Sequence, residues 1–235
     1  GVCLVEADGS LYASAHIWRT QHISAELKHH VPQRDDSSWN KFTTELTGIN
    51  NDLFGFSVSL NNNGTKIAVG APTGNTNQSG KVSIWPKSES ENRWDNNSLA
   101  DLTITNNNTY FGYSVSLNHT GNRIAVGAPN YSDDEQSWRG KVIVYQENEE
   151  NGVLEWTKYG DDINGSSQFD RSGISVSLDK KGNKVAIGVA QSDETTNTAR
   201  GYVRVYEANA ESIVEWSQLG ENIDGEADGD MSGKT

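Results

Sequence analysis

Hydrophobic and polar residues alternate in short runs along most of this chain, and glycine, asparagine and aspartate separate the runs. In Tyr113–Leu117 the larger apolar side chains alternate with two serines, and this period of two predicts a half-buried β-strand. The next run, residues 123–128, is apolar and rich in small residues. Pro129 ends it, because proline has no N–H to donate to a strand ladder. Residues 113–128 therefore predict a hairpin with a tight turn over residues 118–121.

Two more strands are predicted directly after this hairpin. The polar loop 130–139 leads into residues 140–146, where Val142 and Val144 share one face. A polar turn then precedes residues 153–160, which contain Trp156. The whole pattern of four short antiparallel strands occupies about 60 residues, which is the size of one blade of a β-propeller.

The same pattern recurs along the chain. The glycine that precedes the first strand returns at about 60-residue intervals, as Gly55, Gly112, Gly173 and Gly233. The tryptophan of the fourth strand returns as Trp94, Trp156 and Trp216, and Trp39 fits the same position in a weaker first copy. Repeats of this size pack radially and leave only short edges exposed.

We therefore predict an all-β fold, a β-propeller of four-stranded antiparallel blades with about four blades in this chain. Residues 1–235 would form a single propeller with units at about 1–54, 55–111, 112–172 and 173–232, while 233–235 begin a further unit. The alternative is three units and an unrelated N-terminal cap, because residues 1–38 align poorly. Four blades would form either an arc of a larger ring or a small ring.

The repeated letters identify a family resemblance. Phe54-Gly55 with Gly70-Ala71-Pro72, and Phe111-Gly112 with Gly127-Ala128-Pro129, resemble the FG-GAP repeat of integrin α-like propellers. In the third copy Ser172-Gly173 and Gly188-Val189-Ala190 depart from it. The resemblance implies an extracellular propeller of about seven blades, of which this chain would be a fragment.

Many blades of that family bind calcium in the first hairpin through a loop rich in aspartate. The matching loops here offer neutral oxygens from Asn61, Asn63 and Asn118, whereas Lys180 and Lys181 would repel a cation. Calcium needs several hard oxygen ligands, mostly carboxylates. We therefore expect no cofactor and no metal ligand, with calcium kept as a disfavoured alternative.

Charge limits the choice of partner. The net charge of −13 and the pI near 4.7 argue against nucleic acid, whose phosphates select basic surfaces. The chain also holds no apolar run long enough for direct membrane insertion. We expect a protein or carbohydrate ligand instead.

No catalytic motif is present: G-x-S-x-G, H-E-x-x-H and the P-loop are all missing, and histidine is rare in the three clear repeats. The sequence thus predicts that the chain is not an enzyme and has no catalytic residues.

Sequons of the form N-x-S/T predict a secreted or cell-surface glycoprotein, although no signal peptide opens the chain. The candidate glycosylation sites are Asn63, Asn77, Asn96, Asn107, Asn118, Asn130 and Asn164.

The loops between the second and third strands differ while the strands repeat, which is typical of a binding surface on a fixed scaffold. In the second of these loops the candidate partner-binding residues are Tyr131, Asp133, Asp134 and Trp138. We expect an adhesion or binding module that uses these loops. The alternatives are a lectin-like propeller and a scaffold region of a larger secreted enzyme.

Overall fold

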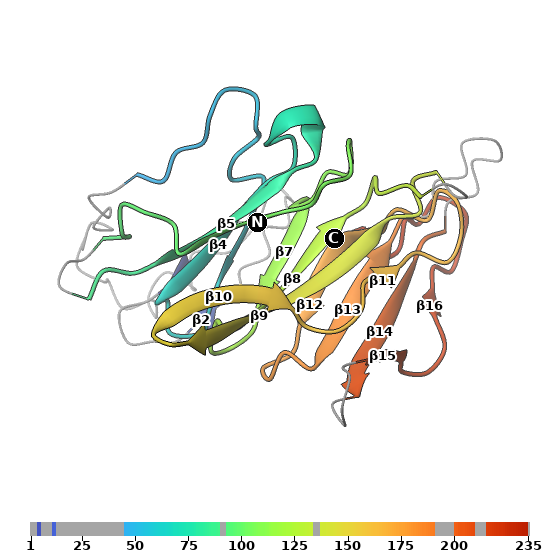
Figure 1. Ribbon diagram of the computed structural model, residues 1–235. Coiled ribbons are helices and arrows are strands. Elements are labelled where there is room, and N and C mark those ends of the chain that lie inside the picture. Colours follow the sequence, from blue (N-terminus) through green and yellow to red (C-terminus); the bar gives the residue numbers. More distant parts are fainter. Residues whose placement is uncertain are drawn as a thin grey trace, which may run out of the picture.

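The computed structural model describes residues 4–5, 11–12, 45–89, 93–133, 137–190, 200–209 and 215–234. These residues form an all-β fold in which three antiparallel sheets stand side by side in chain order, like blades of a propeller (Figure 1). The predicted fold class is therefore confirmed.

Each sheet contains consecutive strands in the order in which they follow one another along the chain. The first sheet consists of β3 (Ser57–Leu60), β4 (Lys66–Ala71), β5 (Lys81–Pro86) and β6 (Ala100–Thr103). The second consists of β7 (Ser114–Leu117), β8 (Arg123–Ala128), β9 (Lys141–Glu150), β10 (Val153–Lys158) and β11 (Ile163–Asn164). The third consists of β12 (Ser172–Leu178), β13 (Lys184–Val189), β14 (Tyr202–Asn209), β15 (Glu215–Gln218) and β16 (Ile223–Asp224). A 3-10 turn, η2 (Thr76–Gln78), lies in the loop before β5.

The outermost strand is divided into two parts, which the sequence pattern does not predict. In the second sheet β10 pairs with the far half of β9, and β11 then pairs with its beginning, Ile163 opposite Val142. β15 and β16 divide the same edge of the third sheet. In the first sheet the tryptophan-containing part is reduced to one bridge between Lys87 and Trp94.

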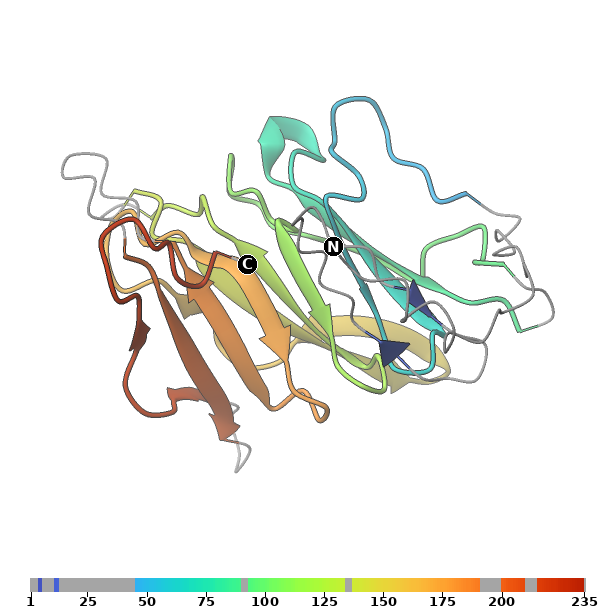
Figure 2. The ribbon, with the colours of Figure 1, turned by 180° about the vertical axis from the view of Figure 1, so that it is seen from behind.

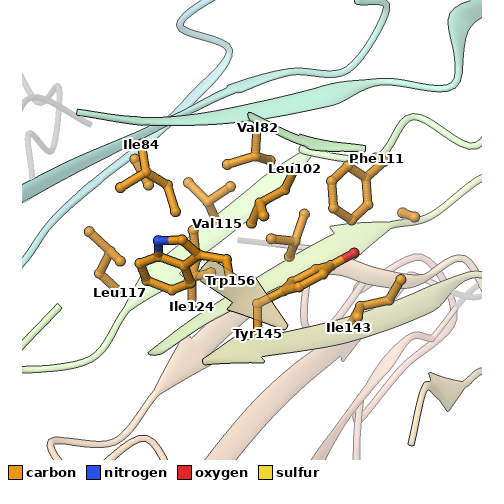
Figure 3. Packing of buried hydrophobic residues seen from close by; sticks show 13 residues of the cluster. Val82, Ile84, Leu102, Phe111, Val115, Leu117, Ile124, Ile143, Tyr145 and Trp156 are labelled. Atoms are coloured by element: carbon orange, nitrogen blue, oxygen red, sulfur yellow. The ribbon is translucent and has the colours of Figure 1, made fainter. Parts of the chain in front are cut away.

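Neighbouring blades pack face to face, and the hydrophobic core lies between them. Figure 3 shows Trp156 and Tyr145 of the second blade directed toward Val82, Ile84 and Leu102 of the first. A second cluster joins Val142 and Ile163 of the second blade to Val185 and Ile187 of the third. Each blade thus completes the core of the next one.

Small residues allow the backbones of neighbouring blades to approach closely. An added Cβ at Gly127 in β8 would overlap the carbonyl oxygen of Gly173, which opens the third repeat. Gly70 meets Gly112 in the same way. The innermost strands β7 and β12 consequently run side by side (Figure 2). The glycines of the repeated FG and GAP letters are therefore needed at the contact between blades.

Repeated serines hydrogen-bond across the same contact. The hydroxyl of Ser114 donates to the carbonyl of Gly173 over 2.8 Å. The hydroxyl of Ser116 accepts a hydrogen bond of 2.9 Å from the backbone N–H of Leu178. Ser57 and Ser59 make the equivalent bonds from the first blade to the second.

The turns of the first hairpins are held by one buried or half-buried side chain each. Asn118 Oδ1 accepts from the backbone N–H groups of Asn122 and Arg123, and Asp179 Oδ1 does the same one repeat later. Burial alone would raise the pKa of Asp179, but backbone N–H donors, that of Lys184 first, lower it below its usual value. The expectation of a tight asparagine-glycine turn is confirmed here.

The first repeat is only partly described. β1 (Leu4–Val5) and β2 (Leu11–Tyr12) form an antiparallel pair, while the rest of residues 1–44 lies outside the described residues. The four-unit division of the chain and its boundaries therefore stay predictions.

Candidate functional site

The loops before the third strand and the connectors before the first strand of the next blade meet at one end of the blades. The N–H of Asn108 donates to the carbonyl of Asn77 over 3.0 Å. In the next blade the N–H groups of Phe169 and Arg171 donate to the carbonyls of Ser137 and Trp138. We refer to this end, formed by residues 72–80, 104–112, 129–133, 137–140 and 165–172, as the loop face.

Trp138 offers an exposed aromatic surface on the loop face, with 36% of the residue accessible. Its ring packs edge-on against Phe169, with the ring centroids 5.7 Å apart, and the Arg171 guanidinium lies 5.1 Å from the ring centroid. Its backbone N–H donates to the Ser132 hydroxyl over 2.9 Å. The indole is therefore held in place before any partner arrives.

The positive φ of Trp138, 50°, belongs to the repeat rather than to a special function of this residue. Gln78 occupies the same position before the third-strand glycine and has a φ of 54°. The two positions share one backbone geometry and differ in the side chain that they present.

The other predicted loop residues are less accessible to a partner than Trp138. Tyr131 is half-buried against the core, and the Lys141 ammonium lies 3.7 Å from its ring centroid. Asp133 forms an ion pair with Arg139, which also donates to the carbonyl of Gly165. Asp134 lies outside the described residues.

A pocket of about 230 Å³ lies between the first and second blades, next to the loop face. Its floor and walls come from β9, from Lys158 of β10, from Asp162 just before β11, and from the end of β6 with the chain that follows it. The lining residues are Thr103, Ile104, Thr105, Asn106, Lys141, Ile143, Tyr145, Lys158 and Asp162.

Asp162 joins two lysines in this pocket. Its two oxygens accept from Lys141 over 2.8 Å and from Lys158 over 2.7 Å. Burial by itself would raise the pKa of Asp162, but the hydrogen bonds and charges of both lysines hold it below its usual value. The cluster therefore carries one net positive charge at neutral pH.

Tyr145 forms the inner wall. Its ring packs edge-on against Phe111 with a centroid separation of 6.2 Å. Burial, and secondarily the negative charge of Asp162, raises the pKa of its phenol well above the ordinary range. The phenol is neutral at physiological pH and serves as a hydrogen-bonding group rather than as a charge.

Most of the predicted sequons are accessible, but one is not. Asn63, Asn77, Asn96, Asn107 and Asn164 are exposed, and Asn130 is half-buried. Asn118 is only 3% exposed and its amide is bonded within the turn, so this candidate is corrected: the fold leaves no room for a glycan there.

Among the described residues, no group of three or more histidine, cysteine, aspartate or glutamate side chains could hold a metal ion. In the same part of the chain, no helix is long and apolar enough to cross a membrane.

The sequence reasoning missed the pocket. The signal was weak but present, because Lys81 and Lys141 both follow the third-strand glycine and pair with Asp101 and Asp162 at the matching edge position.

Comparison with known proteins finds chains of similar fold. No family model and no curated protein sequence matches the chain. Solved structures that resemble it include a candidate 6-phosphogluconolactonase from Bacteroides fragilis, with 13% identity and a TM-score of 0.46 over 72% of this chain. Sqt1 from Chaetomium thermophilum matches with 12% identity and a TM-score of 0.45 over 74%. The chain spans 39% and 38% of the lengths of these two proteins.

The first match contradicts the prediction that the chain is not an enzyme, since a candidate enzyme is among the chains of similar structure. The absence of familiar motifs was an insufficient reason to exclude catalysis. At 13% identity, the match does not assign an activity to this chain. The FG-GAP resemblance stays a prediction, because no family model matches.

Proposed function

We propose that this chain is an extracellular binding module that holds a protein or glycan partner on its loop face, with Trp138 at the centre of the contact. The observation that carries the proposal is an exposed indole fixed from two sides by Phe169 and Arg171. Tryptophan anchors supported in this way dominate binding energies, because little conformational freedom is lost when the partner binds.

The repeat supplies an internal comparison. The first described blade has the same backbone at this position but carries Gln78 instead. A residue needed only for the turn would not have to be a large aromatic. The difference supports a role for the Trp138 side chain in contact with a partner.

The extracellular address is part of the same proposal. It is supported by the five sequon asparagines that are exposed, where a glycan has room. The assignment to the FG-GAP type is supported by the contact between the glycines of both repeated motifs, Gly127 with Gly173 and Gly70 with Gly112.

The test compares Trp138→Ala with Gln78→Ala, its counterpart in the preceding blade. Binding would be measured on a glycan array and by cross-linking from a photoreactive residue at position 138 or 78 on cells of the source organism. We expect Trp138→Ala to weaken binding at least about tenfold. Gln78→Ala should leave it unchanged, and both variants should keep the wild-type melting temperature.

Two results would overturn the proposal. One is a ligand that binds both variants as tightly as the wild type. The other is the lack of any array signal together with no cross-link from position 138.

A further inference from the structure

We propose that the pocket between the first two described blades is a subsite for one acidic sugar unit, whose carboxylate binds between Lys141 and Lys158. The inference rests on the binding function proposed above and names a ligand class for it. It concerns residues separate from Trp138, so the two can fail independently.

The size of the pocket favours a small unit. Its volume of about 230 Å³ lies below the roughly 300–1,000 Å³ of sites that enclose drug-sized ligands. One sugar ring, or the end of a glycan chain, is a ligand of suitable scale.

The charges favour a carboxylate. Each lysine ammonium has three N–H donors, and Asp162 accepts one from each of Lys141 and Lys158. Donors therefore remain for a ligand, and the cluster has one positive charge that Asp162 does not neutralise. The net charge of −13 on the whole chain is screened over about 8 Å at physiological salt, so the local charge determines what binds here.

The other blades show that this surplus charge is not a general need of the fold. In the first blade Lys81 pairs with Asp101 over 3.4 Å, one charge against one. In the third blade the edge position holds Asn222, which accepts from Arg204 and Gln218. Of these three described edges, that of the second blade is the one where two lysines, Lys141 and Lys158, bond a single carboxylate, that of Asp162.

The rest of the lining favours a sugar over an acidic peptide side chain. Thr103, Thr105 and Asn106 provide hydroxyl and amide groups that can donate to and accept from ring hydroxyls. Ile143 and Tyr145 provide an apolar wall for the C–H face of a ring. An aspartate or glutamate side chain would satisfy the lysines but would make no use of the hydroxyl and amide groups of the polar wall.

The pocket is also connected to the loop face. Lys141 begins β9 directly after the loop that contains Trp138, and its ammonium lies against the ring of Tyr131. A glycan chain with its acidic end in the pocket could therefore extend over the loop face.

The experiment uses glucuronic and galacturonic acid as probes, with glucose and galactose as neutral controls, and follows binding by calorimetry and NMR titration. Lys158→Met removes the charge from a side chain that is 51% exposed, so the variant should fold. We expect it to weaken uronic acid binding about fivefold or more. Thr105→Val should also weaken binding, while Lys81→Met, at the equivalent pair, should not.

Several outcomes would overturn the assignment. Neutral sugars that bind as tightly as the uronic acids, or uronic acid binding that survives Lys158→Met, would exclude the carboxylate subsite. An acetylated glutamyl peptide that binds as tightly as the uronic acids would make the pocket an acidic-peptide site. Loss of array binding in Trp138→Ala with unchanged uronic acid affinity would leave both proposals standing, since the sites are separate.

Discussion

Glycine positions decide how closely neighbouring blades can approach. Gly127 has no side chain where the carbonyl of Gly173 passes, and Gly188 faces Gly233 in the same way. The small residues of the run 123–128 are visible in the sequence, and the close approach at Gly127 gives a physical reason for one of them. Their exact partners could not be predicted, because the partner lies one whole repeat away.

We expect Gly127→Ala to lower the free energy of unfolding by about 2–3 kcal/mol, because the added methyl group forces the two blades apart. Urea denaturation would measure the change. Gly152→Ala is the matched control: its φ of 79° disfavours alanine, but an added Cβ there meets no atom within 4 Å, so we expect a loss of only about 1 kcal/mol. Because Gly127 has no positive φ, a loss in Gly127→Ala no larger than that in Gly152→Ala would contradict the importance of the contact between blades.

Acidic residues differ in how far the sequence reveals their role. Asp52 and Asp170 stand three residues before Gly55 and Gly173, and both accept backbone N–H bonds in a turn, which is the usual role of a short acceptor at a fixed position before a strand. Asp162 could not be assigned in this way, because the lysines that it joins are brought together only by the pairing of β9, β10 and β11.

The Asp162 carboxylate should make stability depend on pH. Its pKa in the folded chain is lowered from the ordinary value of 3.8, so the stabilisation is complete above that value and is lost as pH falls through the lowered one. We expect Asp162→Asn to cost about 1–3 kcal/mol at pH 7 and progressively less below pH 3.8. Chemical denaturation at a series of pH values would test this. A cost that stays constant as the pH falls, or an equal cost from its exposed neighbour Asp161→Asn, would contradict the assignment.

At the scale of elements, the four strands of a blade were predicted from period-two patterning. The first three are present in all three described sheets, and the tryptophan-containing fourth strand forms as β10 and β15 in the second and third, whereas Trp94 in the first makes a single bridge. The divided outer edge was not predicted. In the second sheet the chain leaves β9 after Lys158 and returns to it at Ile163, and the short return segment has too few residues to show a period. Asp162, which lines the pocket, stands directly before this segment, so its place beside Lys141 follows from a pairing that the pattern does not predict.

The serines on the first strand of each blade provide a test of the contact between blades. Ser116 accepts the N–H of Leu178, so Ser116→Ala should leave that donor without its partner and cost about 1 kcal/mol. Ser177 holds the same position one repeat later and is exposed, so Ser177→Ala should be close to neutral. Thermal unfolding of the two variants measures the difference. Equal melting temperatures would show that the hydrogen bond adds nothing to the packing.

At the scale of the whole molecule, the repeat predicts the architecture because one contact is used again at each blade boundary. Ile163 is 5% exposed where the third blade covers it, whereas its counterpart Ile223 in the last blade is 61% exposed. The same residue type in the same register is therefore core or surface according to its neighbour. Burial of this kind cannot be predicted from one repeat alone.

The bonds across each blade boundary have a consequence for where this chain can be divided. Gly112 opens the second clear repeat, yet its carbonyl accepts from the hydroxyl of Ser57 in the blade before. Gly173 and Gly233 are bonded in the same way to Ser114 and Ser175. The first residue of each repeat is thus hydrogen-bonded into the preceding blade. A cut placed at the repeat boundary would remove this residue from the blade that it was meant to release intact.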